Sequence, residues 1–583
     1  MAHDYAAGFV SLLRGMHGGI EPDILAQDQY AKGLNVSSRR GLISTRPMFK
    51  EFAASGSLPV GLFQGAAVYR LNAADRIIFA VAGGIYGINT DTNALTTYAV
   101  AGSMSATAER FYFAQADKYM IVQDGVNRPY VIGYADDPDA ATQASGVEVP
   151  TGTIMAYGHG RLYVVVTEIG GVDAGQRFFA AGDIMLPNNP ITVLSFTETD
   201  YLAGGGALSL PNELGFITGM AFLRNARTGS GDGALIVMAQ HGCSSFSVNA
   251  PRGQWQDITI SQILFTDAGT RSPFGLISVN SDLMFRGMDG LRTIGFSVAS
   301  IQNNQTLLAN EPISREVDDI LTLDGKDDLG YVFGAFVDSR AFYTAIGATD
   351  DSGQHYFKSL VVLDGSSVSS FGKPYTPAYD GIWTGFSFLS LHKAFKDEGE
   401  TLYSFVKDDD GFLYLVYLSK SEDDHVDCAA SRTLCRLYTR VFDFGKQIEP
   451  KRVKSMELWL SDIHGELDVT AYWRPAGYPL WNAFSEMETI AGSGSLGHMM
   501  RRLRFTISAD ACDPVMKKKL DLGEEFQFCV QWTGQCRIRK AVFFAEKNTE
   551  QHVNACEVSV DGVVLAAGEA GIEIDDLTYE VEL

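Results

Sequence analysis

The sequence contains no apolar run that approaches the length of a transmembrane helix, which needs about 20 consecutive apolar residues. Its opening residues, Met1 to Tyr5, have no basic n-region and no signal-type cleavage pattern. These absences argue against a membrane-spanning protein and against Sec export. Hydrophobic residues still make up 46% of the 583, so the chain can bury a core. Its length predicts two or three domains.

Cysteine is scarce as well. The 7 cysteines are odd in number and include no closely spaced CxxC pair, which argues against a disulfide framework and against a structural zinc site. Cys428 and Cys435, with His425 nearby, could in principle hold a metal. Reduced cysteines in strands and loops are the simpler interpretation. We therefore predict no metal site and no cofactor.

Positive charge is also in deficit. Lys and Arg number 46 against 70 Asp and Glu, which gives a formal net charge of −24. A protein that grips nucleic acid through phosphates needs a basic stripe, and the sequence shows none. An acidic surface repels DNA and suits a protein past which DNA must slide, although it equally marks any soluble acidic protein.

Motifs of common catalytic sites are missing. The sequence has no GxSxG and no HExxH, and Gly204–Gly206 lacks the Gly-Lys-Ser/Thr that follows in a phosphate-binding loop. Asp408–Gly411 lacks the alternating acids and distal Glu of an EF-hand, and its place between apolar strands predicts a hairpin turn. His159 precedes a strand, and we predict that it is a turn residue. We predict no catalytic residue.

Short strands and turns are abundant, in keeping with 60 glycines and 24 tyrosines. The clearest example is the segment Arg76–Tyr98. It predicts two strands joined by Gly83-Gly84, a tight turn at Asn89–Asn93 and a third strand. Looser copies begin at Tyr119, Gly160, Ala234, Asp282, Arg340 and Thr401. Hairpins that follow one another without helical spacers predict an irregular β-propeller, with a sandwich carrying long insertions as the alternative.

These patterns divide the chain into three regions. Residues 1–50 do not resemble a blade and form an extended N-terminal arm, and residues 51–420 form the propeller. One short helix is expected within the propeller, with Ser314 as its N-cap and Val317, Ile320 and Leu321 on one face. From 435 to 583, period-two alternation predicts at least six strands in a β-sandwich-like domain, among them 455–460, 465–473, 526–532 and 536–544. The protein is therefore predicted to be all-β.

The arm carries a more specific pattern. Its features are Gly18-Gly19, Pro22-Asp-Ile-Leu25, Asp28-Gln29, Asn35, Gly41-Leu42 and Arg46-Pro47. In order and spacing, over about thirty residues, this segment resembles the amino-terminal segment of the tail tubular protein B, or nozzle, family of short-tailed bacteriophages. Beyond it, the likeness is one of layout only. Independently of any family, the prolines and glycines rule out a long helix and indicate an irregular strap laid across another surface. The alternative is an ordinary N-terminal strand that closes the propeller ring.

The resemblance implies a virion structural protein, made in the host cytoplasm and built into the phage tail. It implies a homo-hexameric ring that binds a tail adaptor protein and tail fibres, with DNA present only in transit. The candidate assembly contacts are Gly18, Gly19, Pro22, Asp28, Arg39, Arg40, Arg46 and Pro47. The acidic loop of Asp136, Asp137 and Asp139 is a candidate for the channel lumen. A propeller that binds a carbohydrate or receptor, or that hydrolyses glycosides with two carboxylates about 5 to 10 Å apart, is the alternative function.

Overall fold

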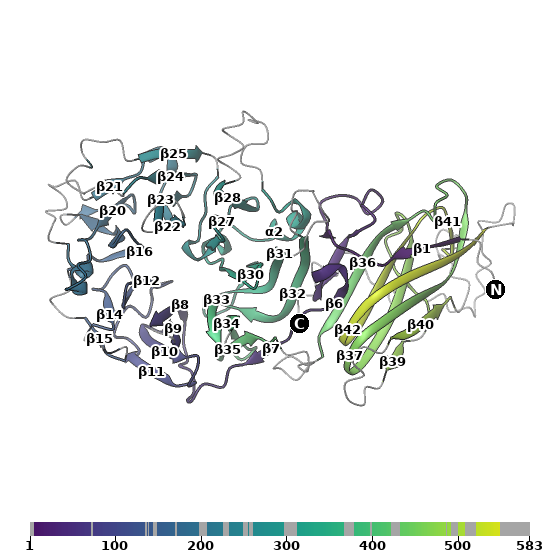
Figure 1. The fold of residues 1–583 in the computed structure, drawn as a ribbon, viewed down its shortest axis with the longest axis horizontal. Coiled ribbons are helices and arrows are strands. Elements are labelled where there is room, and N and C mark those ends of the chain that lie inside the picture. Colours follow the sequence, from purple (N-terminus) through teal and green to yellow (C-terminus); the bar gives the residue numbers. More distant parts are fainter. Residues whose placement is uncertain are drawn as a thin grey trace.

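The structure is a computed structural model. It describes residues 5–71, 74–134, 137, 139–143, 148–169, 172–196, 207–224, 232–248, 255, 261–266, 268–295, 312–365, 378–396, 399–420, 432–485, 487–490, 500–507 and 520–547. Strands make up 57% and helices 6%, so the predicted all-β class is confirmed. Figure 1 shows a ring of sheets and a curled sheet, with the purple N-terminal arm between them.

Five separate sheets of three or four strands form propeller blades. The first contains β8 (Phe63–Leu71), β9 (Ala74–Val81), β10 (Gly84–Asn89) and β11 (Leu95–Ala99). The second contains β12 (Tyr112–Ala116), β13 (Tyr119–Gln123), β14 (Tyr130–Ile132) and β15 (Ala141–Thr142). The third contains β16 (Gly152–Gly158), β17 (Arg161–Val166), β20 (Phe178–Ala181) and β21 (Ala207–Ser209). The fourth contains β22 (Ile217–Arg224), β23 (Asp232–Ala239), β24 (Gly242–Phe246) and β25 (Ser261–Thr266), and the fifth contains β26 (Leu276–Val279), β27 (Asp282–Arg286) and β28 (Leu291–Thr293).

Two groups of strands from a larger sheet continue the ring. One contains β29 (Gly334–Val337), β30 (Arg340–Thr349), β31 (His355–Asp364) and β32 (Ala378–Phe388). The other contains β33 (His392–Lys396), β34 (Gly399–Lys407) and β35 (Leu413–Leu418). The first strand of each group contacts the first strand of the next, from β8 through β12, β16, β22, β26, β29 and β33 back to β8. The irregular propeller predicted from the sequence is confirmed.

Local sequence explains the blades. The β9–β10 turn places Ala82 and Gly83 at φ of 49° and 75°, the left-handed geometry of a tight hairpin. Ile77 and Phe79 pack in one hydrophobic cluster, whereas Ile78 and Ala80 pack in the next. Because both faces of an inner strand are buried between neighbouring blades, such strands are continuously apolar.

Helical structure is confined to short turns in the part of the chain that the structure describes. The predicted helix is present as the 3-10 turn η6 (Arg315–Val317) followed by α2 (Asp318–Leu321), and its apolar face is buried. Ser314 occupies the predicted N-cap position, but its hydroxyl accepts a hydrogen bond from Leu291 N at 2.9 Å and makes no capping bond to the helix. The other short elements are β18 (Glu168–Ile169), β19 (Val172–Asp173), η2 (Pro190–Leu194), η3 (Asn212–Leu214), η5 (Pro273–Gly275) and η7 (Asp328–Gly330).

The C-terminal region is a curled sheet built on two long strands, β37 (Lys451–Pro475) and β42 (Phe526–Lys547), which pair antiparallel. Smaller strands extend it: β36 (Leu434–Phe442), β38 (Asn482–Ala483), β39 (Glu488–Ile490), β40 (Arg501–Thr506) and β41 (Leu522–Gly523). The sequence suggested separate strands at 455–460 and 465–473, and again at 526–532 and 536–544. The structure corrects this, because left-handed φ values at Asp462, Gly465 and Gly534 bend continuous strands instead of ending them.

The arm joins the two regions. Its strands are β1 (Tyr5–Phe9), β2 (Gly15–Met16), β3 (Gln29–Tyr30), β4 (Lys32–Leu34), β5 (Val36–Ser37), β6 (Ile43–Thr45) and β7 (Phe49–Glu51), with η1 (Arg39–Gly41) before β6. Strand β4 pairs with β32 of the propeller and with β36 of the curled sheet. Strands β1 and β6 pair with β42, and β7 pairs with β35. The arm is thus a strap across its own chain, and its last strand also joins the final propeller sheet.

Candidate functional site

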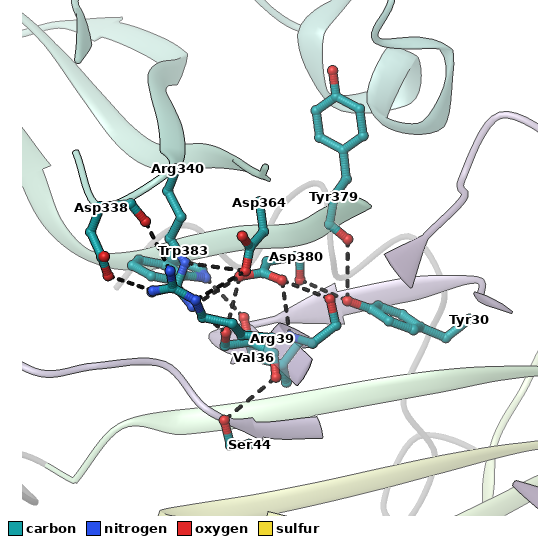
Figure 2. A network of polar contacts seen from close by, with 12 residues as sticks. Tyr30, Val36, Arg39, Ser44, Asp338, Arg340, Asp364, Tyr379, Asp380 and Trp383 are labelled. Carbon is teal, nitrogen blue, oxygen red and sulfur yellow. Dashed lines mark hydrogen bonds and ion pairs between the residues drawn. The ribbon is translucent and has the colours of Figure 1, made fainter. Parts of the chain in front are cut away.

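A network of buried polar groups lies where the arm crosses β32, and we call it the arm joint (Figure 2). Asp380, on β32, is fully buried. One carboxylate oxygen accepts from the Ser38 backbone N–H at 2.9 Å and from the Ser38 hydroxyl at 2.7 Å. The other accepts from the Ser37 hydroxyl at 3.1 Å. One propeller carboxylate therefore fixes two consecutive arm residues.

Two arginines surround this carboxylate. Arg340, on β30, donates to the Ser37 hydroxyl at 2.6 Å and lies 3.7 Å from Asp380 and 3.6 Å from Asp364. Arg39, on the arm, lies 3.7 Å from the same Asp364 oxygen and pairs with Asp338 at 2.5 Å. Since Asp364 and Asp380 are buried, the arginines compensate charge that would otherwise be costly to bury.

Aromatic side chains complete the joint. The Tyr30 hydroxyl donates toward the backbone oxygens of Tyr379 and Asp380 at 3.3 and 3.1 Å. Burial, assisted by the nearby Asp380 charge, raises the pKa of Tyr30 well above its usual value, so its hydroxyl stays protonated and can donate. Trp383 donates its indole N–H to the Val36 oxygen at 2.9 Å. An arm side chain therefore bonds to the β32 backbone, and a β32 side chain bonds to the arm backbone.

A second cluster lies at the end of the arm. Asn35 adopts a φ of 53° and uses every polar atom of its side chain. Its amide donates to the Thr384 hydroxyl and the Leu434 oxygen, and its oxygen accepts from Arg46 at 3.0 Å and from Thr384 N at 2.7 Å. Asn35 thus joins arm, propeller and curled sheet at one point.

Arg46 is fully buried beside Asn35. Besides its bond to Asn35, it donates to the oxygens of Pro47 at 3.0 Å and Thr384 at 2.9 Å. Its guanidinium lies over the Phe49 ring, 5.3 Å from the centroid. Arg46 therefore links the arm to β32 through buried hydrogen bonds.

The remaining predicted contact residues lie along the same path. Gly18 donates to the Glu316 oxygen at 2.7 Å, and a Cβ at Gly19 would meet the Arg315 oxygen at 2.2 Å, so no side chain fits there. The Pro22 oxygen accepts from Val441 N at 2.9 Å. The backbone oxygen of Asp28 bonds within the arm, where it accepts from Arg14 N at 3.1 Å.

Arg40 belongs to η1, and Pro47 lines a cavity of about 360 Å³ between arm, propeller and curled sheet. Charged groups of both signs line this cavity, including Arg39, Asp338 and Arg537. The cavity adjoins the arm joint and reaches the curled sheet. Whether any of these residues contacts another protein stays a prediction.

The acidic loop is only partly described. Asp136 lies outside the described residues, whereas Asp137 and Asp139 are exposed between β14 and β15. Asp139 forms an ion pair with Arg76 of the neighbouring blade. Because β14 and β15 are the outer strands of their blade, this loop is distant from the propeller axis; its relation to an assembled channel stays a prediction.

The other sequence candidates have ordinary surroundings. Asp408–Gly411 forms the predicted hairpin turn, and His159 occupies the turn between β16 and β17 at a φ of 49°. Cys435 is buried, whereas His425, Cys428 and Gly204–Gly206 lie outside the described residues. Among the described residues, no group of three or more His, Cys, Asp or Glu is placed to hold a metal.

Sequence reasoning named Arg39 and Arg46 as assembly contacts and noted Asn35 in the arm pattern, but it did not single out Asp364, Asp380 or Arg340 as site residues. One signal was available: Asp380 interrupts the apolar strand Ala378–Phe388, where an unpaired carboxylate would be costly. Such a residue indicates a buried partner, although its identity follows only from the fold.

Charge burial at Asp380 makes a testable prediction. Burial and the nearby Asp364 charge raise the pKa of Asp380, and together they outweigh Arg340, which lowers it. Ionising this carboxyl therefore costs more in the folded chain than in the unfolded chain, and its contribution to stability falls as pH rises above about 4. We expect Asp380→Asn to destabilise the protein by about 2 kcal/mol, because the amide keeps one acceptor oxygen where the two oxygens of Asp380 accept from Ser37 and Ser38. The difference in unfolding free energy between wild type and Asp380→Asn should become smaller as pH rises, as measured by urea unfolding at several pH values. A difference that widens with pH would contradict this assignment.

No known family matches the sequence, and no curated protein matches it. Among solved structures, the chain is similar to the extracellular domain of a protein described as the one component system BT4673 from B. thetaiotaomicron, at 10% identity and a TM-score of 0.33. That likeness covers 78% of this chain and 47% of the other, so the chain spans about half its length. The chain is also similar to the AfRom2 CNH domain, at 10% identity and a TM-score of 0.32, over 64% of this chain and 99% of the domain. In the described part, no helix is long and apolar enough to cross a membrane.

Proposed function

We propose that this chain is a structural subunit of the nozzle ring that ends a short phage tail and encloses the path of DNA ejection. The observation that carries the proposal is the position of the residues in the family-like segment. Gly18, Gly19, Asn35 and Arg46 lie on the strap that ties propeller to curled sheet. The spacing of these residues therefore follows from the path of a strap that contacts both the propeller and the curled sheet.

The mechanical logic is consistent with this role. A propeller resists deformation because each blade is packed between two others. The arm joint couples that ring to the curled sheet through buried, fully specified polar contacts and a shared hydrophobic core. A rigid subunit of this kind suits the wall of a channel, and its proposed role is mechanical and involves no catalysis.

Particle assembly tests the proposal. Virions assembled without this chain are expected to have an incomplete tail tip, and adding purified protein should restore it. Reproducible cleavage of a host polysaccharide by the purified protein, lost on a single Asp→Asn or Glu→Gln change, would instead support the glycoside-hydrolysing alternative and overturn the proposal.

The charge balance makes a separate prediction. With 70 acidic and 46 basic residues, the subunit should bind duplex DNA more weakly than nonspecific binders, which reach about 10⁻⁴ to 10⁻⁶ M at physiological salt. Fluorescence anisotropy with a labelled duplex checks this. Tight binding that weakens steeply with salt would point to genome anchoring, not to passage.

A further inference from the structure

Exposed aliphatic side chains of the first two blades lie on one face of the propeller. Neighbouring strands within each blade are antiparallel, so the same face carries the segments that enter β8 and β12, the β9–β10 and β13–β14 turns, and the end of β11. Val60, Val100 and Val126 lie on these segments and are 71%, 67% and 71% exposed. In Figure 1 the two blades form the lower left of the ring.

Backbone hydrogen bonds join two of these segments through the β9–β10 turn. Ala82, in that turn, donates to the Leu62 oxygen at 3.0 Å and accepts from Gly102 N at 2.9 Å. The segment that carries Val60 and the segment that carries Val100 are therefore fixed on either side of the same turn. Their exposed side chains belong to one continuous surface.

The third valine is held by a buried carboxylate. Asp124 is 5% exposed, and its carboxylate accepts from Val126 N at 2.9 Å and from Asn127 N at 2.7 Å. It also accepts from Ser105 N at 2.9 Å, on the segment that follows Val100. The β13–β14 turn is thus tied to the same surface, and Val126 is presented outward on a turn that several hydrogen bonds fix.

The surface is also poor in charge. Residues 53–62 and 99–108 contain no Asp, Glu, Lys or Arg, although charged residues make up 20% of the chain. Exposed charge follows at Glu109 and Arg128. Residues 144–147, after the second blade, lie outside the described residues and contain no charged residue either. An apolar centre with polar residues at its margin is typical of a protein–protein interface. We call this surface the uncharged face, and it contains Val60, Ala82, Val100, Ala101, Gly102 and Val126.

We propose that the uncharged face binds a second copy of this chain. Each copy carries a net charge of −24, so two copies repel each other wherever their acidic residues meet. A basic partner is bound best by acidic surface, whereas a partner of like charge needs a surface without charge. This inference rests on the proposed function and specifies a subunit contact within the ring. The neighbour contributes a different surface, because a patch that binds its own copy forms a twofold pair instead of a ring.

Carboxylates placed on the uncharged face test the contact in the full-length protein. Val100→Glu with Val126→Glu should weaken the affinity between copies by roughly 100-fold, because an apolar contact is replaced by charge of the repelling sign. The matched control is Ile184→Glu with Leu186→Glu. These two aliphatic residues are 45% and 49% exposed and follow the end of β20, on the opposite face of the propeller. The control should assemble like wild type, as measured by mass photometry and electron microscopy.

A neutral variant and a salt series separate lost apolar contact from added repulsion. Val100→Gln with Val126→Gln adds no charge and should weaken the affinity by roughly 10-fold. Because salt screens the repulsion between acidic copies, self-association of the wild type should become stronger as the salt concentration rises. Self-association that weakens steeply with salt would indicate a contact made by ion pairs and would overturn the proposal.

The outcomes separate this contact from the proposed function. Rings that persist in the Glu and Gln variants, with melting temperatures unchanged, would overturn the contact and leave the proposed ring function standing. Rings that persist while binding to the tail adaptor protein is lost would assign the face to the adaptor and also overturn the contact. Wild-type protein that forms only twofold pairs, or that forms no ring even with the adaptor, would overturn both proposals.

Discussion

Removal of residues 1–47 is expected to separate the propeller and the curled sheet into two bodies that unfold independently and at lower temperature. The deletion removes β1 to β6 but keeps β7, so the pairing of β7 with β35 is retained. It also removes Met16, Tyr30, Val36 and Ile43, all buried in the core shared by both regions. Each such side chain stabilises the fold by about 1.5 to 3 kcal/mol through burial.

Tryptophan fluorescence during thermal unfolding checks this result. Trp383 reports on β32 of the propeller, whereas Trp473 and Trp532 report on the curled sheet. We expect one transition in the full chain and two in the truncated one. A shorter deletion of residues 1–10, which removes only β1, is the control and should cost less. A truncated protein that melts like the full chain in one transition would show that the arm is dispensable for the joint.

Replacing Arg46 with Ala is expected to cost about 3 to 5 kcal/mol of unfolding free energy. The change removes the hydrogen bonds to the oxygens of Asn35, Pro47 and Thr384 and leaves space beside Phe49. Arg46→Lys should recover only part of the loss, because an ammonium group cannot reach three acceptors in the planar geometry of guanidinium.

Urea unfolding monitored by circular dichroism measures these differences. Arg128→Ala, at an exposed arginine on the propeller, is the matched control and should stay within about 0.5 kcal/mol of wild type. An Arg46→Ala variant as stable as that control would mean that the buried guanidinium contributes nothing net to the joint.

The propeller could be predicted from the sequence because its information is local. The turn at Ala82 and Gly83 and the apolar strands on either side fix a hairpin within a few residues. Repetition of that unit then favours blades. The glycines and prolines of the arm likewise argue against a long helix, and the arm contains only short strands and one 3-10 turn over residues 5–51.

The position of the arm could not be predicted, because its partners are far away in the sequence. Asn35 contacts Thr384 and Leu434, and Ser38 contacts Asp380, across sequence separations of 342 to 399 residues. The long strands of the curled sheet could not be predicted for a different reason. Gly465 and Gly534 resemble turn residues in sequence, yet they bend strands that continue beyond them.

Electron microscopy of the purified full-length chain, mixed with the tail adaptor protein, tests the central claim most directly. The account predicts a closed ring of sixfold symmetry attached below the adaptor, with a propeller and a curled sheet visible in each subunit and a continuous central channel. Protein that stays monomeric beside the adaptor at micromolar concentration, with no ring and no bound complex, would contradict it.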